Sequence, residues 1–422
     1  MSEGKLASGQ VSTLINEAIA GRLSRREILR RGAALGLAAP LVSAMLTVAE
    51  RAGTAAAPNG EPILIGSPYN LTGGLASLDN PARDGGLLAA KELNAKGGVL
   101  GRPVELKVYD GKSDVTACTN VAKKLTEEDK VPALAGLTDS TFALPVAQVA
   151  QKAKVPYLIV GATAPILTQV GDYIFLVPFG DNVQAAVGAE FAGQKGWKTC
   201  ALLWDQQSVY CKYLSTYFKE RYTQSDIGGK VVRELKYSSG DTDFSSQLTE
   251  FKGLNPQPDF LYIASDPAEI GPIIKQARDR GLNQPIVGGD GYDTPDLIKF
   301  AGAASHDVYF TTHEGIYGDS PVAKAFTANF QQEYGHAPDS VFAALGYDGV
   351  NMLADAITRA NSLDGDKIRD ALATTKGFEG ASGTITYNPG QRVPSKSVVL
   401  IAVVDQKFTV LDILIPKQVP KP

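Results

Sequence analysis

The stretch PALAGLTDSTFALPVAQVAQKAKVPYLIVGATAP, residues 132–165, largely determines the expected fold. Its apolar runs at 133–135 and 155–160 predict two short buried strands. Each run leads into a loop of small and hydroxylated residues, at 137–141 and 161–165. In an open parallel sheet, ligands bind at the carboxyl ends of the strands, where helix N-termini present backbone N–H groups. We therefore expect both loops to face the same cleft.

A helix over 142–153 connects the two strands, and the Asp, Ser and Thr residues at 139–141 are preferred helix caps. Strand, helix and strand together form a βαβ unit. The preceding sequence repeats this rhythm, with expected strands at 63–66 and 104–109 and expected helices at 81–95 and 114–128. Asn80 and Pro81 suit the cap and the first residue of the earlier helix. The alternation predicts a doubly wound α/β lobe.

A second alternating series begins at Asp181 and predicts a second α/β lobe. Its expected helices lie at 183–195, 211–222, 244–254 and 267–280, and its expected strands at 199–204, 230–237, 260–264 and 285–288. Helices at 322–334 and 341–361 are expected to return to the first lobe, and a hairpin over 383–411 to close the second. Residues 415–422 are expected to form a frayed C-terminal tail.

Length and composition agree with two compact domains, because the chain has 422 residues, of which about 365 remain after a leader. Charged residues make up 20% of the chain, hydrophobic residues 44%, and the formal net charge is -4. This composition and net charge indicate neither nucleic-acid binding nor a disordered acidic or basic tail.

The first 57 residues resemble a twin-arginine signal peptide. Ser24, Arg25 and Arg26 match the export motif, and the apolar run 32–46 is too short to span a membrane stably. Small residues at 55–57 suit cleavage. The resemblance implies a twin-arginine translocase as export partner and a soluble exported protein; an amphipathic helix with incidental arginines is the alternative.

No residue pattern indicates catalysis, a cofactor or a metal. The three histidines lie outside HExxH, no GxSxG turn occurs, and Asp241-Thr242-Asp243 lacks the rest of a calcium loop. Cys118, Cys200 and Cys211 have neither zinc nor disulfide-framework spacing. We expect buried free thiols, with a Cys200–Cys211 bridge as the alternative.

Several segments in the same order resemble the branched-chain amino-acid periplasmic binding proteins, which are solute receptors of ABC importers. They are GGLASLDNPARDGGLLAAKELNAKGGVLGRPVELKVYD at 73–110, the loops LTDST and GATAP, and SSGDTDFSSQLTEFKGLNPQPDFLYIASDPAEIGPIIKQARDRGLNQPIVGGDGYDTPDL at 238–297. The resemblance covers essentially the whole mature chain.

The resemblance implies a type I periplasmic binding protein fold, with two doubly wound α/β lobes joined by three hinge crossings. We place the crossings near Gly180, Thr312 and Lys376. Lobe I would then comprise 61–180 plus 313–375, and lobe II 181–312 plus 376–414. The implied function is a non-enzymatic periplasmic receptor, expected to be monomeric, that delivers a small molecule to inner-membrane permease subunits. A ligand-sensing subunit for a membrane receptor and an exported hydrolase on the same fold are the alternatives.

The resemblance also implies where the ligand would bind. Expected first-lobe ligand residues are Asp79, Thr138, Asp139, Ser140, Thr141, Gly161 and Thr163. Expected second-lobe ligand residues are Trp204, Tyr210, Asp266, Asp290 and Tyr292, with a core role as the alternative for the three aromatic residues. Asp290 matches the acid that takes the ligand ammonium in the amino-acid binders.

Three acids depart from the family pattern. Asp139 falls where a small hydroxylated residue would meet the ligand carboxylate, Asp266 falls where an aromatic residue is common, and Asp79 occupies another ligand-side loop. They could be helix caps, since Asp266-Pro267-Ala268-Glu269 fits a capping box. Carboxylates converging on one cleft would instead favour a cation. We therefore expect an ammonium or guanidinium ligand that aromatic rings contact through cation–π interactions, with calcium as a variant.

Overall fold

The computed structural model describes residue 14, residues 25–35, 37, 42–43 and residues 58–422. Two compact units are described separately: residues 1–61 with 94–103, and residues 62–93 with 104–422. The first unit contains α2 (Arg25–Ala34), and in it Asn59 N–H donates to the Gly101 carbonyl at 2.8 Å. Ser24 of the predicted export motif and the expected cleavage region 55–57 lie outside the described residues.

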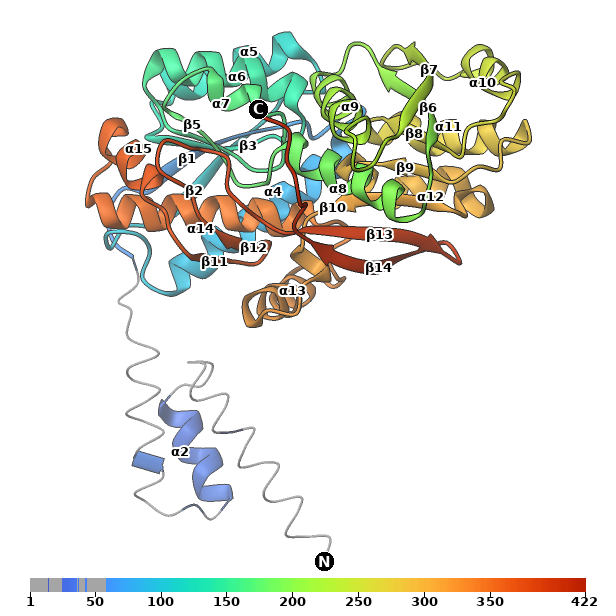
Figure 1. Cartoon of the computed structure of the whole chain (residues 1–422). Coiled ribbons are helices and arrows are strands. Elements are labelled where there is room, and N and C mark those ends of the chain that lie inside the picture. The colour runs from blue at the N-terminus through green and yellow to red at the C-terminus, as the bar shows by residue number, and fades with distance from the viewer. Residues whose placement is uncertain (1–13, 15–24, 36, 38–41, 44–57) are drawn as a thin grey trace, which may run out of the picture. The chain divides into compact units, whose positions relative to one another are not determined.

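The second unit contains a five-stranded parallel sheet in the order β2-β1-β3-β4-β5 (Figure 1). Its strands are β1 (Ile63–Tyr69), β2 (Val104–Asp110), β3 (Ala133–Gly136), β4 (Tyr157–Ile159) and β5 (Ile174–Leu176). The helices with this sheet are α4 (Ala76–Ala95), α5 (Val115–Lys123), the π-helix η1 (Lys124–Glu128), α6 (Ser140–Ala153), α7 (Ile166–Gln169), α13 (Pro321–Tyr334), α14 (Phe342–Ala360) and α15 (Gly365–Ala373). We call this sheet with its helices the first lobe. In it, α5 and α6 cover one face of the sheet, and α4 and α14 cover the other.

A seven-stranded sheet in the order β14-β13-β10-β9-β8-β6-β7 forms what we call the second lobe. Its strands are β6 (Thr199–Asp205), β7 (Lys230–Tyr237), β8 (Phe260–Ala264), β9 (Ile286–Gly288), β10 (Val308–Thr312), β13 (Val398–Val404) and β14 (Lys407–Leu414). Its helices are α8 (Asp181–Gln194), α9 (Val209–Tyr222), α10 (Ser245–Lys252), α11 (Pro267–Asp279), α12 (Pro295–Ala301) and the 3-10 turns η2 (Asp290–Tyr292) and η3 (Gly302–Ser305). A further 3-10 turn, η4 (Gly315–Tyr317), contacts α13 and α14 of the first lobe. Strands β6 to β10 pair in parallel, whereas β13 and β14 are antiparallel to their neighbours.

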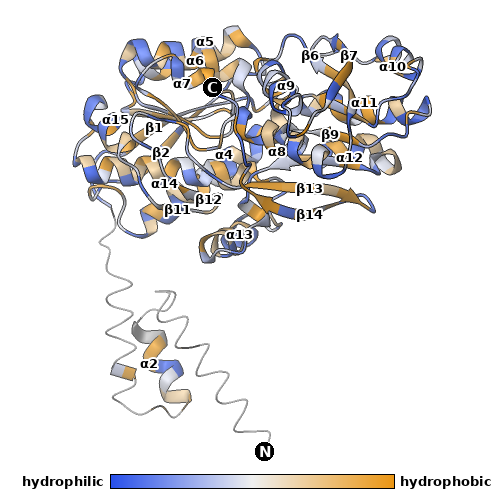
Figure 2. Cartoon of the chain, in the orientation of Figure 1, coloured by the Kyte–Doolittle hydropathy of each residue, from blue (hydrophilic) through white to orange (hydrophobic). Residues whose placement is uncertain are grey.

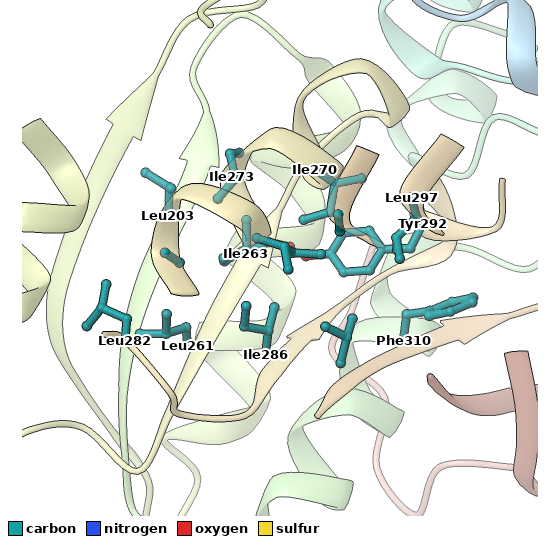
Figure 3. Close-up of a cluster of buried hydrophobic side chains, with 14 of the residues drawn as sticks. Leu203, Leu261, Ile263, Ile270, Ile273, Leu282, Ile286, Tyr292, Leu297 and Phe310 are labelled. Atoms are coloured by element: carbon teal, nitrogen blue, oxygen red, sulfur yellow. The ribbon is translucent and has the colours of Figure 1, made fainter. Parts of the chain in front are cut away.

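Apolar strands make the core of each lobe, as the orange colour of β13 illustrates in Figure 2. In the second lobe, strand residues such as Leu261 and Ile263 pack against Ile270 and Ile273 of α11 (Figure 3). Helices α8 and α9 cover the opposite face of this sheet. The predicted class of two doubly wound α/β lobes is therefore confirmed, while the exact lobe boundaries stay a prediction.

Helix α4 begins at Ala76 rather than at Pro81, so the predicted cap was wrong. Asn80 Nδ2 donates instead to the Leu71 carbonyl at 3.2 Å, and Asp79 Oδ2 accepts the Asn70 N–H at 2.6 Å. The two polar side chains hold the loop that precedes the helix. Pro81 lies inside the helix, where it lacks the N–H that would donate to the carbonyl four residues earlier.

The predicted hairpin over 383–411 is confirmed only in part, because the hairpin begins at Val398 rather than at Gly383. The segment divides into β12 (Gly383–Ile385), which pairs with β11 (Phe378–Gly380), and the β13–β14 hairpin at the edge of the second lobe. The short helices α12 and α15 and the strand β10 were missed.

The C-terminal residues 415–422 are not frayed. The N–H groups of Lys417 and Gln418 donate to the Glu190 carboxylate of α8, and Asn182 Nδ2 donates to the Pro420 carbonyl at 2.9 Å. Together with other segments, the tail lines a cavity of about 870 Å³. Among the described residues no helix combines the length and apolar character needed to cross a membrane.

Candidate functional site

Two loops of the first lobe adjoin at the carboxyl ends of β3 and β4, as the sequence predicts. Gly161 N–H donates to the Leu137 carbonyl at 3.1 Å, and Ala164 N–H donates to Ser140 Oγ at 3.1 Å. Glycine is required at 161, since a Cβ there would lie 2.9 Å from Thr138 Cβ and 2.8 Å from the Phe342 ring. The two loops therefore form one connected surface.

Asp139 caps α6, because its Oδ1 accepts the Thr141 N–H at 2.8 Å. The side chain is only 3% exposed. Burial raises the pKa of Asp139 to about 6, although the hydrogen bonds from Thr141 oppose the shift. The expected cap is confirmed. Burying the negative charge of this carboxylate costs free energy.

The second lobe meets these loops at the N-terminus of α9. Val209 N–H donates to Thr141 Oγ1 at 3.0 Å, so a hydrogen bond joins the two lobes on this side. The side chains of Val209 and Tyr213 pack against the apolar core of the first lobe. Ser208 caps α9 by accepting the Cys211 N–H at 3.2 Å. The lobes are therefore closed upon each other here.

Asp266 occupies the N-cap position of α11, but its side chain makes no capping hydrogen bond. The predicted capping box was wrong, because the Glu269 carboxylate accepts the Gly240 N–H at 2.9 Å. Asp266 Oδ2 has the thiol of Cys211 at 3.9 Å. Burial, followed by the charge of Asp139, raises the pKa of Asp266 well above its usual range. The two acids thus influence each other from opposite lobes.

Asp290, which was expected to bind an ammonium group, already has protein partners. Its Oδ1 accepts from Gln184 Nε2 at 2.8 Å, and its Oδ2 lies 3.1 Å from His313 Nε2. His313 is fully buried and stacks on Phe179 at 3.8 Å between ring centroids. Burial lowers the pKa of His313. The prediction of a free ammonium-binding acid at 290 is not supported by these contacts.

The three aromatic candidates separate in the structure. Tyr292 Oη donates to the Ile263 carbonyl at 2.6 Å, and the ring lies inside the apolar core of the second lobe (Figure 3). Trp204 Nε1 donates to Glu234 Oε1 at 2.8 Å, and the Lys236 ammonium lies over its ring. Tyr292 therefore has the core role that was the alternative, whereas Trp204 is only partly buried. Tyr210 is also buried, in the apolar cluster of α8, α9 and the sheet, and its Oη accepts the Gly291 N–H at 3.1 Å.

Asp79 and Thr163 are both buried in the first lobe. Burial raises the pKa of Asp79 to about 7. The hydrogen bonds that this carboxyl group accepts from the Asn70 N–H and from Thr138 oppose the shift. The Thr163 carbonyl accepts the Asp181 N–H at 2.8 Å, which ties the second loop to the start of α8.

Sequence reasoning missed Asp205, Ser208 and Gln184. Asp205 ends β6 and accepts the Gln207 N–H at 2.8 Å, and Ser208 follows it as a helix cap. A polar residue at a strand end followed by a capping serine was the available signal for both. Nothing in the local sequence indicates that Gln184 would bind Asp290, which lies 106 positions later.

The cysteines and the acids show no metal chemistry. All three cysteines are free and buried, so the Cys200–Cys211 bridge is not formed. Within the described residues, no group of three or more His, Cys, Asp or Glu side chains is arranged to hold a metal ion.

Known proteins share this architecture. The sequence profile of the family described as "Periplasmic binding protein" matches residues 62–407. A leucine-binding protein from Thermotoga maritima is 35% identical, with a TM-score of 0.79, over 84% of this chain and 99% of that chain. A branched-chain amino-acid transporter substrate-binding protein from Streptococcus pneumoniae, in complex with isoleucine, is 31% identical, with a TM-score of 0.78, over 84% of this chain and 100% of that one.

A third similar structure holds a different kind of ligand. It is an ABC-transporter solute-binding protein from Rhodopseudomonas palustris in complex with 3,4-dihydroxybenzoic acid, 26% identical, with a TM-score of 0.75, over 85% of this chain and 99% of that chain. These homologues are substrate-binding proteins rather than enzymes. The chain belongs to the periplasmic binding protein family, in the branched-chain amino-acid type of ABC-transporter substrate-binding proteins.

Proposed function

We propose that this protein is the periplasmic solute-binding component of an ABC importer and that it is not an enzyme. Its ligand, a small amino-acid-like or cationic amine compound, would bind between the two lobes. The observation that carries the proposal is the convergence of the 137–141 and 161–165 loops with the N-terminus of α9, through the Thr141–Val209 hydrogen bond. Clefts between domains are common ligand sites.

The proposed ligand residues are those that border this convergence. They are Thr138, Asp139, Ser140, Thr141, Gly161, Thr163, Tyr210 and Asp266. Asp79, Trp204, Asp290 and Tyr292 stay predicted ligand residues; protein groups bind the last three, and Asp79 is fully buried.

The cellular setting is part of the same proposal. The twin-arginine-like leader supports export by the twin-arginine translocase and cleavage near 55–57, and the family supports delivery to inner-membrane permease subunits. We propose lobe boundaries at the predicted crossings near Gly180, Thr312 and Lys376, and a monomeric mature protein. Permease and ATPase genes beside this gene would support transport, whereas a kinase or chemoreceptor gene would favour sensing.

A ligand screen tests the proposal. Mature protein would be stripped of bound ligand by unfolding and refolding, then screened by thermal shift against aliphatic amino acids, amines, guanidines and aromatic acids. A true ligand at a hundredfold excess over Kd should stabilise the fold by about 3 kcal/mol. Small-angle scattering should then show compaction as the hinge closes. A saturating ligand that leaves the scattering unchanged would contradict a cleft between the lobes.

A further inference from the structure

A cavity of about 870 Å³ lies outside the proposed ligand cleft. Its lining comes from α7 of the first lobe, from the start of α8 in the second lobe, and from the segments 388–397 and 415–422 that flank the β13–β14 hairpin. The residues that we propose for the ligand cleft are not part of this lining. The volume is in the range of pockets that hold small organic molecules. The cavity is therefore a separate candidate for a binding site.

The wall of this cavity contains a buried ammonium group. Lys396 lines the cavity and is only 8% exposed. Its Nζ donates to Ser382 Oγ at 2.7 Å, and its other two hydrogens have no partner among the described residues. Asp348 accepts from the same hydroxyl group, but within residues 58–422 no carboxylate is close enough to Nζ for an ion pair. A buried cation without an ion-pair partner is costly.

Arg392 lines the same cavity, and its guanidinium group also has an unused donor. Nη2 donates to the Thr168 carbonyl at 2.8 Å, whereas the buried Nε has no hydrogen-bond partner in the part of the chain that the structure describes. Asp172 is influenced by the charge of Arg392 but forms its ion pair with Arg369 at 3.2 Å. Two cations with unused donors therefore border the cavity.

The acidic residues of the lining do not neutralise these two cations. The carboxylate of Glu314 is bound by the hydroxyl group of Ser397. Glu379 is exposed, and so is Lys421, so their opposite charges are screened by solvent. The less exposed part of the lining thus has two positive charges and one negative charge, which favours an anion.

Apolar side chains make up another part of the lining. Val183 of α8, Val393 and two residues of the C-terminal tail, Ile415 and Val419, border the cavity. Ile415 is 79% exposed and Val419 is 44% exposed. A ligand with an apolar body would remove part of this surface from water, which is favourable.

We propose that the cavity binds a small organic anion, a carboxylate with an apolar body, at a second site separate from the interlobe cleft. The carboxylate lies against Lys396 and Arg392, and the apolar body lies against Val393 and the C-terminal tail. Hydrogen bonds between a carboxylate and these cations are charge-assisted, which makes them stronger than bonds between neutral groups. The site therefore pairs the buried ammonium group with a charge that the protein itself does not supply.

Calorimetry on the mature protein tests the site with hexanoate and with 1-hexanol, its uncharged counterpart. Hexanoate should bind, and 1-hexanol should bind at least about tenfold more weakly. Lys396→Met removes the charge but keeps a long side chain, and it should weaken hexanoate binding at least about tenfold. Lys407→Met removes an exposed lysine at the start of β14 and is the matched control, which should bind hexanoate like wild type.

A pH series needs no variant. Burial lowers the pKa of Lys396 to about 8, although the charges of Asp348 and Glu314 oppose the shift. The charge of His313 also interacts with Lys396, but burial lowers the pKa of His313, so this side chain is neutral above pH 7. Because the carboxylate requires the ammonium form, affinity for hexanoate should fall about tenfold between pH 7 and pH 9. At pH 8 binding should take up protons, visible as a heat that depends on the buffer.

Several results would overturn the site. They are the absence of heat up to about 10 mM hexanoate, equally tight binding of 1-hexanol, and equal affinity for hexanoate at pH 7 and pH 9. Hexanoate binding that Lys396→Met leaves unchanged would place the probe elsewhere, for example in the interlobe cleft. If Lys396→Met does not fold, Arg392→Gln replaces it and should weaken hexanoate binding at least about tenfold. The proposed function stands or falls independently, because its ligand binds between the lobes.

Discussion

A single buried acid, Asp79, should govern part of the pH dependence of stability. It is fully buried in α4, and burial raises its pKa to about 7. Between about pH 4 and pH 7, the folded chain therefore holds a proton that the unfolded chain has lost. Within this range, the free energy of unfolding falls as the pH rises. Asp79→Asn removes this titration. In urea unfolding at pH 5, 6 and 7, the free energy of unfolding of the variant minus that of wild type should increase by about 1 kcal/mol per pH unit.

Asp319→Asn is the matched control, because Asp319 is 98% exposed and pairs with Lys324 on the surface. The difference between this variant and wild type should stay constant over the same pH range. A constant difference for Asp79→Asn as well would show that Asp79 is ionised in the folded protein at pH 5.

The roles of the site residues were partly predictable from the sequence. Asp139 as a cap and the pairing of the two loops followed from small polar residues after short apolar runs. The roles of Asp290 and Tyr292 did not, because their partners are distant in sequence: His313 lies 23 positions away, and Ile263 lies 29 positions away. Local spacing does not show which way a loop side chain turns.

At the scale of elements, two glycines set how closely α4 and α14 cross. A Cβ at Gly85 would lie 1.8 Å from the Ala343 carbonyl oxygen, and one at Gly346 would lie 1.9 Å from the Ala82 carbonyl oxygen. Gly85→Ala or Gly346→Ala must therefore separate the helices, and each should lower the free energy of unfolding by about 1–3 kcal/mol in urea titrations.

Gly188→Ala in α8 is the control for this crossing. Its added Cβ would meet Tyr262 and Val287 at ordinary contact distances of 3.7 and 3.8 Å. Alanine favours helices over glycine, so this variant should be as stable as wild type or more stable by up to about 1 kcal/mol. Equal losses for all three variants would rule out close helix packing as the cause.

Element positions followed from periodicity where a strand or helix has one clear apolar pattern. Strands β7 and β8 were predicted with the bounds that the structure has. The start of α4 was not, because Asp79 and Asn80 hold the loop at 70–71 by tertiary hydrogen bonds. The docked tail was missed for the same reason, since its backbone N–H groups donate to Glu190, which lies more than 220 positions earlier.

At the scale of the whole molecule, alternating strands and helices were enough to predict two α/β lobes, because each such series can bury its apolar strands only between layers of helices. How far the lobes close upon each other depends on contacts that join distant segments. Such contacts have no periodic signature in the sequence, so closure has to be tested on the protein itself.

The Thr141–Val209 hydrogen bond makes closure testable. Thr141→Val keeps the side-chain volume but removes the acceptor, which leaves the Val209 N–H unpaired in the closed form and free to bind water in the open form. The closed form should lose about 1 kcal/mol. Scattering from the ligand-free variant should therefore show a larger radius of gyration than scattering from wild type. This readout separates hinge closure from any contact between Thr141 and the ligand. Thr119→Val is the control, because its hydroxyl bonds only the Val115 carbonyl of its own helix. A radius of gyration equal to wild type in both variants would mean that other contacts hold the lobes closed.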